Sequence, residues 1–212
     1  MPVQYIFLFI LIGALGIGLV VLGLMGLHQR RRRGLMARAA HEMGMKFSAG
    51  DPFDLTRRYS AFVLSSAGHS QRAENVLYGR YEGWYLRIFD YHLECGHGPR
   101  RLTRRYSVIV ADTDLIIPSA LMWHSDDAEH APLAARRPVG RVRQWLVISG
   151  AWFAPALAEA FADFADQPVG LQTNYGSVML CSAARFKPAE LPAKMNSAVA
   201  GLSALRAEGG AL

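Results

Sequence analysis

Residues 3–33, VQYIFLFILIGALGIGLVVLGLMGLHQRRRR, decide how the rest of the chain is organised. The run from Val3 to Leu27 contains no Asp, Glu, Lys or Arg, and four consecutive arginines begin at Arg30. A helix of this length extends about 37 Å, and the hydrocarbon core of a bilayer is about 30 Å thick. The pattern therefore predicts one transmembrane helix, with residues 1–29 forming a membrane anchor.

A cleaved signal peptide is the alternative interpretation of the same stretch. It requires a basic segment, an apolar run of about 7–15 residues and a small-residue cleavage site, in that order. Here nothing basic precedes the apolar run, and the run is longer. The nearest triplet with the cleavage-site pattern, Ala37-Arg38-Ala39, lies beyond the arginines. These features favour the anchor.

The basic residues that flank the apolar run all lie on its C-terminal side. The positive-inside rule places this side in the cytosol and the N-terminus outside. Cys95 and Cys181 are the only cysteines, which does not make a disulfide framework. We therefore expect a single-pass protein of a cytoplasmic (inner) membrane, with its C-terminal domain in the cytosol.

The formal net charge of +6 does not indicate a nucleic-acid-binding protein. Four of the 23 basic residues are Arg30, Arg31, Arg32 and Arg33, which leaves 19 against 17 acidic residues. Membrane topology explains the cluster, together with attraction to anionic headgroups of about 1 kcal/mol per residue. We expect the lipid bilayer as a partner, and no nucleic acid.

Small residues inside the apolar run indicate a face for helix pairing. Ala14 and Gly18 lie four residues apart, a spacing that lets a second membrane helix approach closely. Glycine is also frequent in membrane helices generally, which is the alternative explanation. Ala14 and Gly18 are thus candidate packing residues for a membrane-protein partner or for self-association.

The rest of the chain is expected to fold as one α+β domain, because its length suits a single hydrophobic core. We divide it into a basic juxtamembrane helix (30–46), a cytosolic domain (47–206) and a flexible tail (207–212). Gly44 is the expected end of the juxtamembrane helix, since glycine readily adopts the left-handed conformation of a helix C-terminus.

Aromatic and aliphatic runs joined by short turns predict a mainly antiparallel sheet with flanking helices. One hairpin is expected over residues 75–91 with a turn at Glu82-Gly83, and a second at Asn174-Tyr175-Gly176. Further strands are expected at 104–111, 115–123 and 142–149, a short helix from Asp51 to Tyr59, and longer helices at 153–165 and 188–206. Loops are expected at 65–74, 92–101 and 124–138.

Two stretches carry side chains that bind metal ions, each combining imidazole with a thiol or a carboxylate. The candidates are His92, Cys95 and His97 in one stretch and His124, Asp126 and His130 in the other. Asp112 and Asp114 are a third candidate, for Mg²⁺. Each stretch is equally typical of an exposed loop or a strand end, and we predict no cofactor.

No motif identifies a reaction. The chain lacks Gly-x-Ser-x-Gly, a P-loop, GxGxxG after a strand and His-Glu-x-x-His. Cys181 lies in an apolar strand, where a thiol is usually inert. The aromatic residues between Tyr78 and Tyr91 could stack on a ligand, but they are also typical of a sheet core.

The segment Asn75-Val-Leu-Tyr-Gly79, followed by Gly83 and Phe89-Asp90-Tyr91, comes after a juxtamembrane helix ending Met43-Gly44-Met45-Lys46-Phe47. In this arrangement the chain resembles a class of uncharacterised bacterial membrane-anchored proteins, over roughly half its length. The resemblance implies a bacterial single-pass protein with a cytosolic domain. It brings no activity and no catalytic residues.

The sequence favours a non-enzymatic interaction module that acts as a scaffold, sensor or accessory subunit of a membrane complex. Tethering supports this hypothesis, because an anchor raises the effective concentration of the domain near membrane partners. Two alternatives stay open. One is a membrane-bound metal-dependent hydrolase that uses the candidate ligands, and the other is a lipid- or peptide-binding domain that uses the aromatic sheet.

Overall fold

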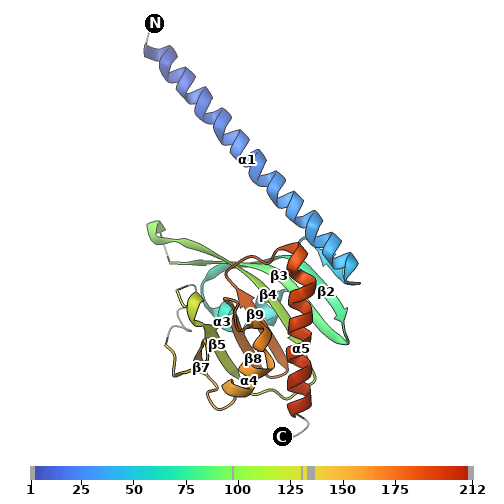
Figure 1. Cartoon of the computed structure of the whole chain (residues 1–212). Coiled ribbons are helices and arrows are strands. Elements are labelled where there is room, and N and C mark those ends of the chain that lie inside the picture. Colours follow the sequence, from blue (N-terminus) through green and yellow to red (C-terminus); the bar gives the residue numbers. More distant parts are fainter. Residues whose placement is uncertain (1–2, 97, 130, 133–136, 210–212) are drawn as a thin grey trace.

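A long N-terminal helix, α1 (Val3–Glu42), projects from a domain built on one sheet (Figure 1). The computed structural model describes residues 3–96, 98–129, 131–132 and 137–209. Among these residues, α1 is the one helix long and apolar enough to cross a membrane, and the rest of the chain buries none of its apolar window. Leu11 and Leu22, for example, are 66% and 67% exposed. The helix therefore differs from an apolar helix in the core of a soluble protein.

The last turns of α1 belong to the domain. The helix passes from the apolar run through the arginines without a break, and Met36, Ala39 and Ala40 are buried in the core. Gly44, with φ +67°, ends it as expected. The N–H of Met45 donates to the carbonyl of Ala40 and that of Gly44 to His41, the two hydrogen bonds of a Schellman motif.

The sheet has nine strands in the described residues, all paired antiparallel in the order β1-β2-β3-β4-β9-β8-β5-β7-β6. The strands are β1 (Lys46–Ser48), β2 (His69–Tyr81), β3 (Trp84–Cys95), β4 (Leu102–Asp112), β5 (Ala120–His124), β6 (Gly140–Val142), β7 (Trp145–Ser149), β8 (Gly170–Asn174) and β9 (Ser177–Ser182). The predicted α+β class with a mainly antiparallel sheet is confirmed.

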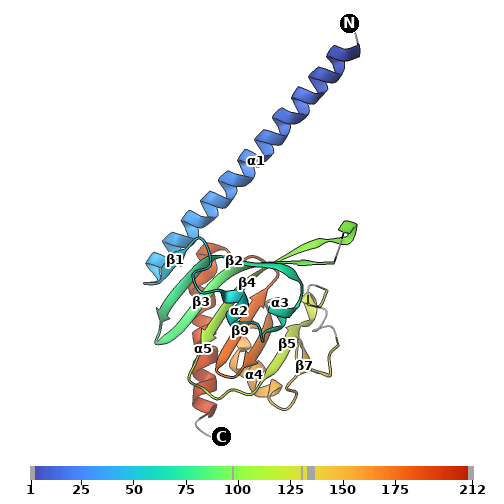
Figure 2. The same cartoon turned by 180° about the vertical axis from the view of Figure 1, so that it is seen from behind.

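Helices cover both faces of the sheet, so the domain has three layers (Figures 1 and 2). On one face α4 (Ala154–Ala160), α5 (Leu191–Gly209) and the end of α1 bury a core that includes Phe161 and Leu202. On the other face the short helices α2 (Leu55–Arg58) and α3 (Val63–Ser66) cover a second core around Trp123.

Two predicted loops are largely strand. Most of residues 65–74 belongs to β2, and β3 continues to Cys95 through the first part of the predicted loop 92–101. The error arises because these residues are polar. Their burial nevertheless alternates, and their backbone groups pair across strands, as in Arg72 opposite His92. A short 3₁₀ turn, η1 (Gly98–Arg100), remains at the tip before β4.

Several predicted helix boundaries differ from the structure. The short helix starts at Leu55 instead of Asp51, because the Asp51 carboxylate accepts the backbone N–H groups of Phe53 and Leu55 and holds a turn ahead of it. The predicted helix 153–165 ends at Ala160 and continues as η4 (Ala162–Phe164). A 3₁₀ turn, η5 (Pro188–Glu190), precedes α5.

The remaining differences lie in loops and at the C-terminus. The predicted loop 124–138 begins with η2 (Ser125–Asp127), and the predicted strand 115–123 is regular only from Ala120. Helix α5 runs to Gly209, three residues into the predicted flexible tail 207–212. The rest of that tail lies outside the described residues.

Candidate functional site at the base of α1

An ion pair joins α1 to the centre of the sheet. Arg32 donates from Nη2 and Nε to the two carboxylate oxygens of Asp90 on β3, at 2.7 and 2.9 Å. The side chains are 11% and 2% exposed. A bidentate Arg–carboxylate pair has a defined geometry as well as strong attraction. It therefore fixes how α1 is rotated about its axis and how far along its length it contacts the sheet.

Three further groups complete this junction. Asn75 Nδ2 donates a hydrogen bond to Asp90 at 2.8 Å, and Ser107 Oγ donates another to Asp90 at 3.3 Å. Arg32 Nη1 donates to the carbonyl of Phe186 at 3.2 Å. Asn75 has φ +53° and sits in a bulge of β2. Asparagine tolerates this left-handed conformation better than most residues, and the bulge turns its amide towards Asp90.

The junction keeps Asp90 ionised. Burial opposes the charged form of this carboxyl, but the hydrogen bonds and the positive charge of Arg32, aided by Asn75, outweigh it and hold the pKa of Asp90 below its ordinary value. Removing either member of such a buried pair leaves an uncompensated charge. The pair is therefore a structural requirement of the helix–sheet contact.

A cavity of about 350 Å³ opens beside this ion pair. It is lined by Leu24, Gln29, Arg32, Arg72, Glu74, Asn75, His92, Arg105 and Arg185. Glu74 already accepts hydrogen bonds from Gln29 and Arg72. Four arginines thus surround the cavity against two carboxylates, Glu74 and Asp90, so positive charge is in excess there.

Two cross-strand rows lie beside this junction cavity, and Glu74 of the first row and all three residues of the second row line it. Glu74, Asp90 and Ser107 lie opposite one another on β2, β3 and β4, and Arg72, His92 and Arg105 form the adjacent row. In the second row His92 lies between the two arginines, and Arg72 is paired with Glu74. Arg105 is therefore the arginine of this row that an anion would pair with.

The charges around the cavity influence one another. The pKa of Arg185 is lowered, first by its burial; the attraction of Asp90 opposes this effect, and the charges of Arg32 and Arg105 add to it. The pKa of His92 is likewise lowered, first by burial and then by Arg185, Arg105 and Arg72, against the opposing effect of Glu74. An anion would reverse the electrostatic part of both shifts.

One buried acceptor in the cavity wall has no partner. Asn75 is 3% exposed, and its Oδ1 makes no hydrogen bond in the structure. The amide orientation follows from Asp90, because a carboxylate requires the NH₂ end to face it. Oδ1 is therefore a buried acceptor for which the described residues supply no donor, on a residue that lines the cavity.

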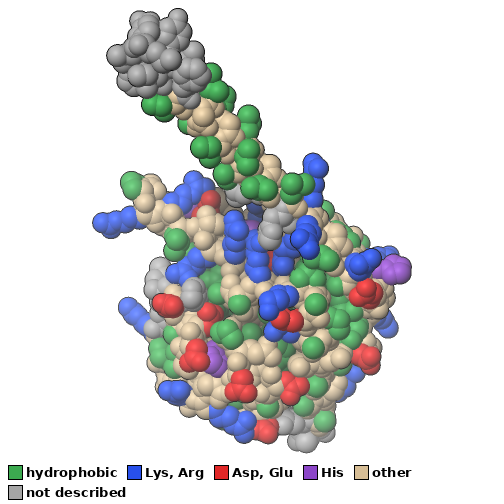
Figure 3. Space-filling model, turned by 45° about the horizontal axis from the view of Figure 1, so that its top comes forward, with side chains coloured by type: hydrophobic (Ala, Val, Ile, Leu, Met, Phe, Trp, Pro, Cys, Tyr) green, Lys and Arg blue, Asp and Glu red, His purple; other side chains and the backbone are tan. Residues whose placement is uncertain are grey.

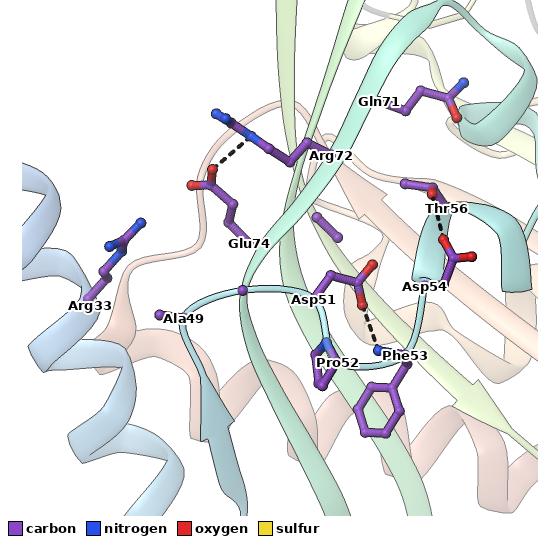
Figure 4. A pocket seen from close by; sticks show the side chains of 12 residues that line it. Arg33, Ala49, Asp51, Pro52, Phe53, Asp54, Thr56, Gln71, Arg72 and Glu74 are labelled. Carbon is purple, nitrogen blue, oxygen red and sulfur yellow. Dashed lines mark hydrogen bonds and ion pairs between the residues drawn. The ribbon is translucent and has the colours of Figure 1, made fainter.

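A second, more open hollow shares Arg72 and Glu74 with the first (Figure 4). Figure 4 shows Arg33 reaching towards it from α1, and the Asp51 carboxylate bound to the backbone of the following turn. Two arginines and three carboxylates line this hollow, including Asp54. Its charges are nearly balanced, so it is the weaker candidate for an anion.

Basic side chains gather where α1 leaves the domain (Figure 3). Arg30 and Arg31 are exposed, whereas Arg32 is engaged in the junction and Arg33 is half-buried. The four arginines that the sequence groups together thus have different surroundings. Ala14 lies in the exposed part of α1, and at Gly18 a Cβ would meet nothing within 4 Å, so the packing role of this face stays a prediction.

The first metal candidate is divided by the sheet. His92 lines the junction cavity, whereas Cys95, an odd number of residues further along β3, faces another hollow and donates its thiol towards the carbonyl of Ala67. His97 lies outside the described residues. The described residues contain no group of three or more His, Cys, Asp or Glu side chains placed to hold a metal.

The second candidate is used for structure. His124 Nδ1 accepts the N–H of Asp126 at 3.2 Å, and Nε2 lies 2.9 Å from the carbonyl of Ala165. One neutral tautomer satisfies both contacts, which leaves no ring nitrogen for a metal. The Asp126 side chain is 81% exposed, and His130 lies outside the described residues.

The third metal candidate and the other suggested groups also have structural partners. Asp112 binds Arg58, Arg87, Tyr59 and Ser177, and Asp114 pairs separately with Arg206. Burial raises the pKa of the Cys181 thiol, which keeps it inert. The aromatic residues of β2 and β3 are buried or half-buried under the covering helices.

The sequence analysis missed the residues that matter most here, namely Glu74, Asn75, Asp90, Arg105 and Arg185. One signal was available, because Asp90 continues the apolar face of a strand after Trp84, Leu86 and Ile88. A carboxylate in that register needs a buried partner. Only the strand order shows that this partner is Arg32.

The fold is that of an α+β domain carried on an N-terminal apolar helix. No protein-family model matches the chain, and no curated protein matches it. Among solved structures, the crystal structure of the mycobacterial trehalose monomycolate transport factor A, TtfA, is similar, with a TM-score of 0.53 and 15% identity over 86% of this chain and 93% of that chain. At this identity the likeness shows a common fold.

Proposed function

We propose that this chain is a single-pass, membrane-anchored accessory module that works within a membrane complex, as a transport-associated factor. The observation that carries the proposal is the buried Arg32–Asp90 pair, which attaches the apolar helix rigidly to the sheet. A flexible tether would only keep a domain near the membrane. A fixed junction holds one surface of the domain against the membrane and its partners.

Two observations support the accessory role. The fold is shared with TtfA, which is named a transport factor. Among the residues it describes, the structure brings no three candidate metal ligands together, so the hydrolase alternative gains no support. The Ala14/Gly18 face of α1 is then the proposed contact for a partner helix.

Orientation and compartment belong to the same proposal. Arg30 and Arg31 are exposed at the end of the apolar run, and the positive-inside rule places them on the cytosolic side of a bacterial cytoplasmic membrane. A reporter fused to the C-terminus should therefore be active only if it is a cytosolic reporter. Activity of a reporter that requires export would contradict this orientation.

Native purification tests the accessory role. We expect the C-terminally tagged full-length chain, extracted in mild detergent, to elute as a discrete complex with a stoichiometric membrane-protein partner. In the double variant Ala14→Leu/Gly18→Leu, the yield of this partner should fall at least several-fold. Gly16→Leu/Gly23→Leu is the matched control, because these positions lie on the opposite face of a helix with about 3.6 residues per turn.

A monomer or homodimer without a partner would overturn the accessory role. Equal loss of the partner in both double variants would show that bulk anywhere in the anchor disrupts the complex, and would remove the Ala14/Gly18 face from the proposal. Immunoblots of the membrane fraction establish that all variants accumulate to similar levels.

A further inference from the structure

We propose that the junction cavity binds the headgroup of an anionic phospholipid that carries a hydroxyl group. Arg105 and Arg185 hold its phosphate, and Asn75 Oδ1 accepts a hydrogen bond from its hydroxyl. This inference rests on the proposed function in one respect, the placement of α1 in a bilayer. It adds a specific site and a ligand class.

The first argument is the availability of the two arginines. Arg32 is committed to Asp90 and Arg72 to Glu74, whereas Arg105 and Arg185 have no ion pair among the described residues. Arg105 is exposed at the rim and Arg185 is half-buried. Guanidinium groups bind phosphate with paired hydrogen bonds. The cavity therefore holds two arginines that form no ion pair with the described residues.

The second argument is the unpartnered Asn75 Oδ1. This acceptor is buried on a residue that lines the cavity, and the described residues offer it no donor. A fully ionised phosphate would not satisfy it, because all its oxygens are acceptors. A hydroxyl attached to the phosphate by a short linker supplies the missing donor. The glycerol headgroup of phosphatidylglycerol has this composition.

The third argument is depth. The cavity wall includes Leu24, within the apolar run, as well as Gln29 and Arg32. From Leu24 to Arg32 an α-helix rises about 12 Å, comparable to the thickness of the headgroup layer plus the edge of the hydrocarbon core. The cavity thus lies where the apolar part of the anchor ends, at the level of the lipid phosphates.

Charge decides between headgroups. Ethanolamine also offers hydrogen-bond donors, but its ammonium group would enter a cavity with an excess of arginines. Choline offers no donor at all. The site should therefore prefer phosphatidylglycerol over both zwitterionic lipids. It should also prefer phosphatidylglycerol over phosphatidic acid, by a smaller factor that depends on Asn75.

The test uses the full-length chain in phosphatidylcholine nanodiscs that contain a small fraction of phosphatidylglycerol. Bound lipid is counted by native mass spectrometry, and affinity is obtained by varying that fraction. Arg105→Gln/Arg185→Gln should weaken binding at least tenfold, since hydrogen bonds to charged groups contribute about 1.5–3 kcal/mol each. Arg57→Gln/Arg80→Gln is the matched control, because both residues are exposed and neither lines the cavity.

Asn75→Gly removes the proposed hydroxyl contact together with the hydrogen bond that Asn75 Nδ2 donates to Asp90. Glycine accepts the positive φ of this position, so the bulge is kept and only the amide is lost. The preference for phosphatidylglycerol over phosphatidic acid should fall by about two- to tenfold, the value of one neutral hydrogen bond. A thermal unfolding curve with a single transition in each variant verifies that the domain is folded.

The outcomes separate the possible sources of the ligand. Displacement of the lipid by soluble glycerol 3-phosphate, with the same dependence on Arg105 and Arg185, would support the phosphate site and assign its ligand to the cytosol. Equal lipid binding by the two double variants would overturn the site. The co-purification experiment does not depend on this result, because its variants change only the Ala14/Gly18 face, so either proposal can fail alone.

Discussion

Two carboxylates on neighbouring strands, Asp90 and Asp112, have nearly the same chemistry. Each accepts four hydrogen bonds from side chains. In each case burial opposes ionisation and arginines outweigh it, so both pKa values lie below the ordinary value. The difference between the two lies in what surrounds them.

The partners of Asp112 come from within the domain. Arg87 lies between the rings of Phe53 and Tyr85, with its guanidinium carbon 5.1 and 4.6 Å from the ring centroids. This cluster closes the side of the sheet that α2 covers. Asp90, in contrast, binds α1 and has close by Arg105 and Arg185, which form no ion pair with the described residues. Arginines that are fully paired with a carboxylate stabilise the fold, whereas arginines without an ion pair beside a cavity can bind a ligand.

Replacing Asp90 with alanine should give the largest effect. It leaves the Arg32 guanidinium buried and unpaired, and we expect a loss of about 3–5 kcal/mol in the free energy of unfolding, measured by denaturant titration of the detergent-solubilised chain. The double variant Arg32→Ala/Asp90→Ala should be less destabilised than the sum of the single variants. A loss below about 1 kcal/mol for Asp90→Ala would show that the junction is not structural.

Asp112→Ala should cost less, about 1–3 kcal/mol. Arg87, which is 6% exposed, loses its carboxylate but keeps its hydrogen bond to the Tyr59 hydroxyl. Asp112 is 26% exposed and Arg58 is 49% exposed, so water replaces part of what is lost. The same denaturant titration measures this loss in the free energy of unfolding. A destabilisation equal to or larger than that of Asp90→Ala would reverse the comparison and make the closed cluster the principal support of the sheet.

Histidine gives the junction a pH dependence that the partners of Asp112 lack. The folded state lowers the pKa of His92, so folding favours its neutral form. Stability from this source is complete above the unfolded pKa of about 6.5, and it is lost as the pH falls towards the lower folded value. His92→Gln should therefore flatten the stability curve between about pH 7 and about pH 5, whereas Asp112→Ala should leave its slope unchanged.

The carboxylates act at lower pH. Because their pKa values are lowered, the stability that they contribute is complete above about pH 4 and is lost as the pH falls through the folded values.

An unchanged slope of the stability curve in His92→Gln near pH 6 would mean that another group titrates there, and would contradict the role given to His92.

The smallest effects compare two serines. Ser107 and Ser177 donate to Asp90 and Asp112 at 3.3 and 3.2 Å, but Ser107 Oγ also accepts the buried N–H of Phe186 at 3.0 Å. Ser107→Ala should therefore cost about 1–2 kcal/mol and Ser177→Ala about 0.5 kcal/mol. Equal losses in thermal unfolding would mean that the Phe186 contact contributes little.

Features set by local chemistry could be predicted from the sequence. The apolar run, the turns at Glu82-Gly83 and Asn174-Tyr175-Gly176 and the helix end at Gly44 each depend on neighbouring residues, and the structure contains all of them. The polar half of β2 was missed because composition suggests a loop when strand pairing lies far away in sequence.

The candidate site depends on distant contacts. Arg32 and Asp90 are separated by 58 positions, and Arg32 and Phe186 by 154. Arg185 reaches the cavity because β9 pairs with β4, an order that no local pattern specifies. The histidines and cysteines attracted attention in the sequence because their side chains are chemically versatile. The structure instead gathers arginines and an asparagine.

The unbroken course of α1 has a mechanical consequence. From Val3 to Glu42 the helix has no hinge, and Arg32 fastens it to the sheet. The helix is about 60 Å long, so it acts as a lever. Because Arg32 and the buried end of the helix hold it in the domain, a tilt of the helix by about 10° in the bilayer turns the domain by about the same angle. A bilayer that becomes thinner or thicker changes the tilt of a membrane helix, and with this lever it would also turn the sheet relative to any neighbouring protein.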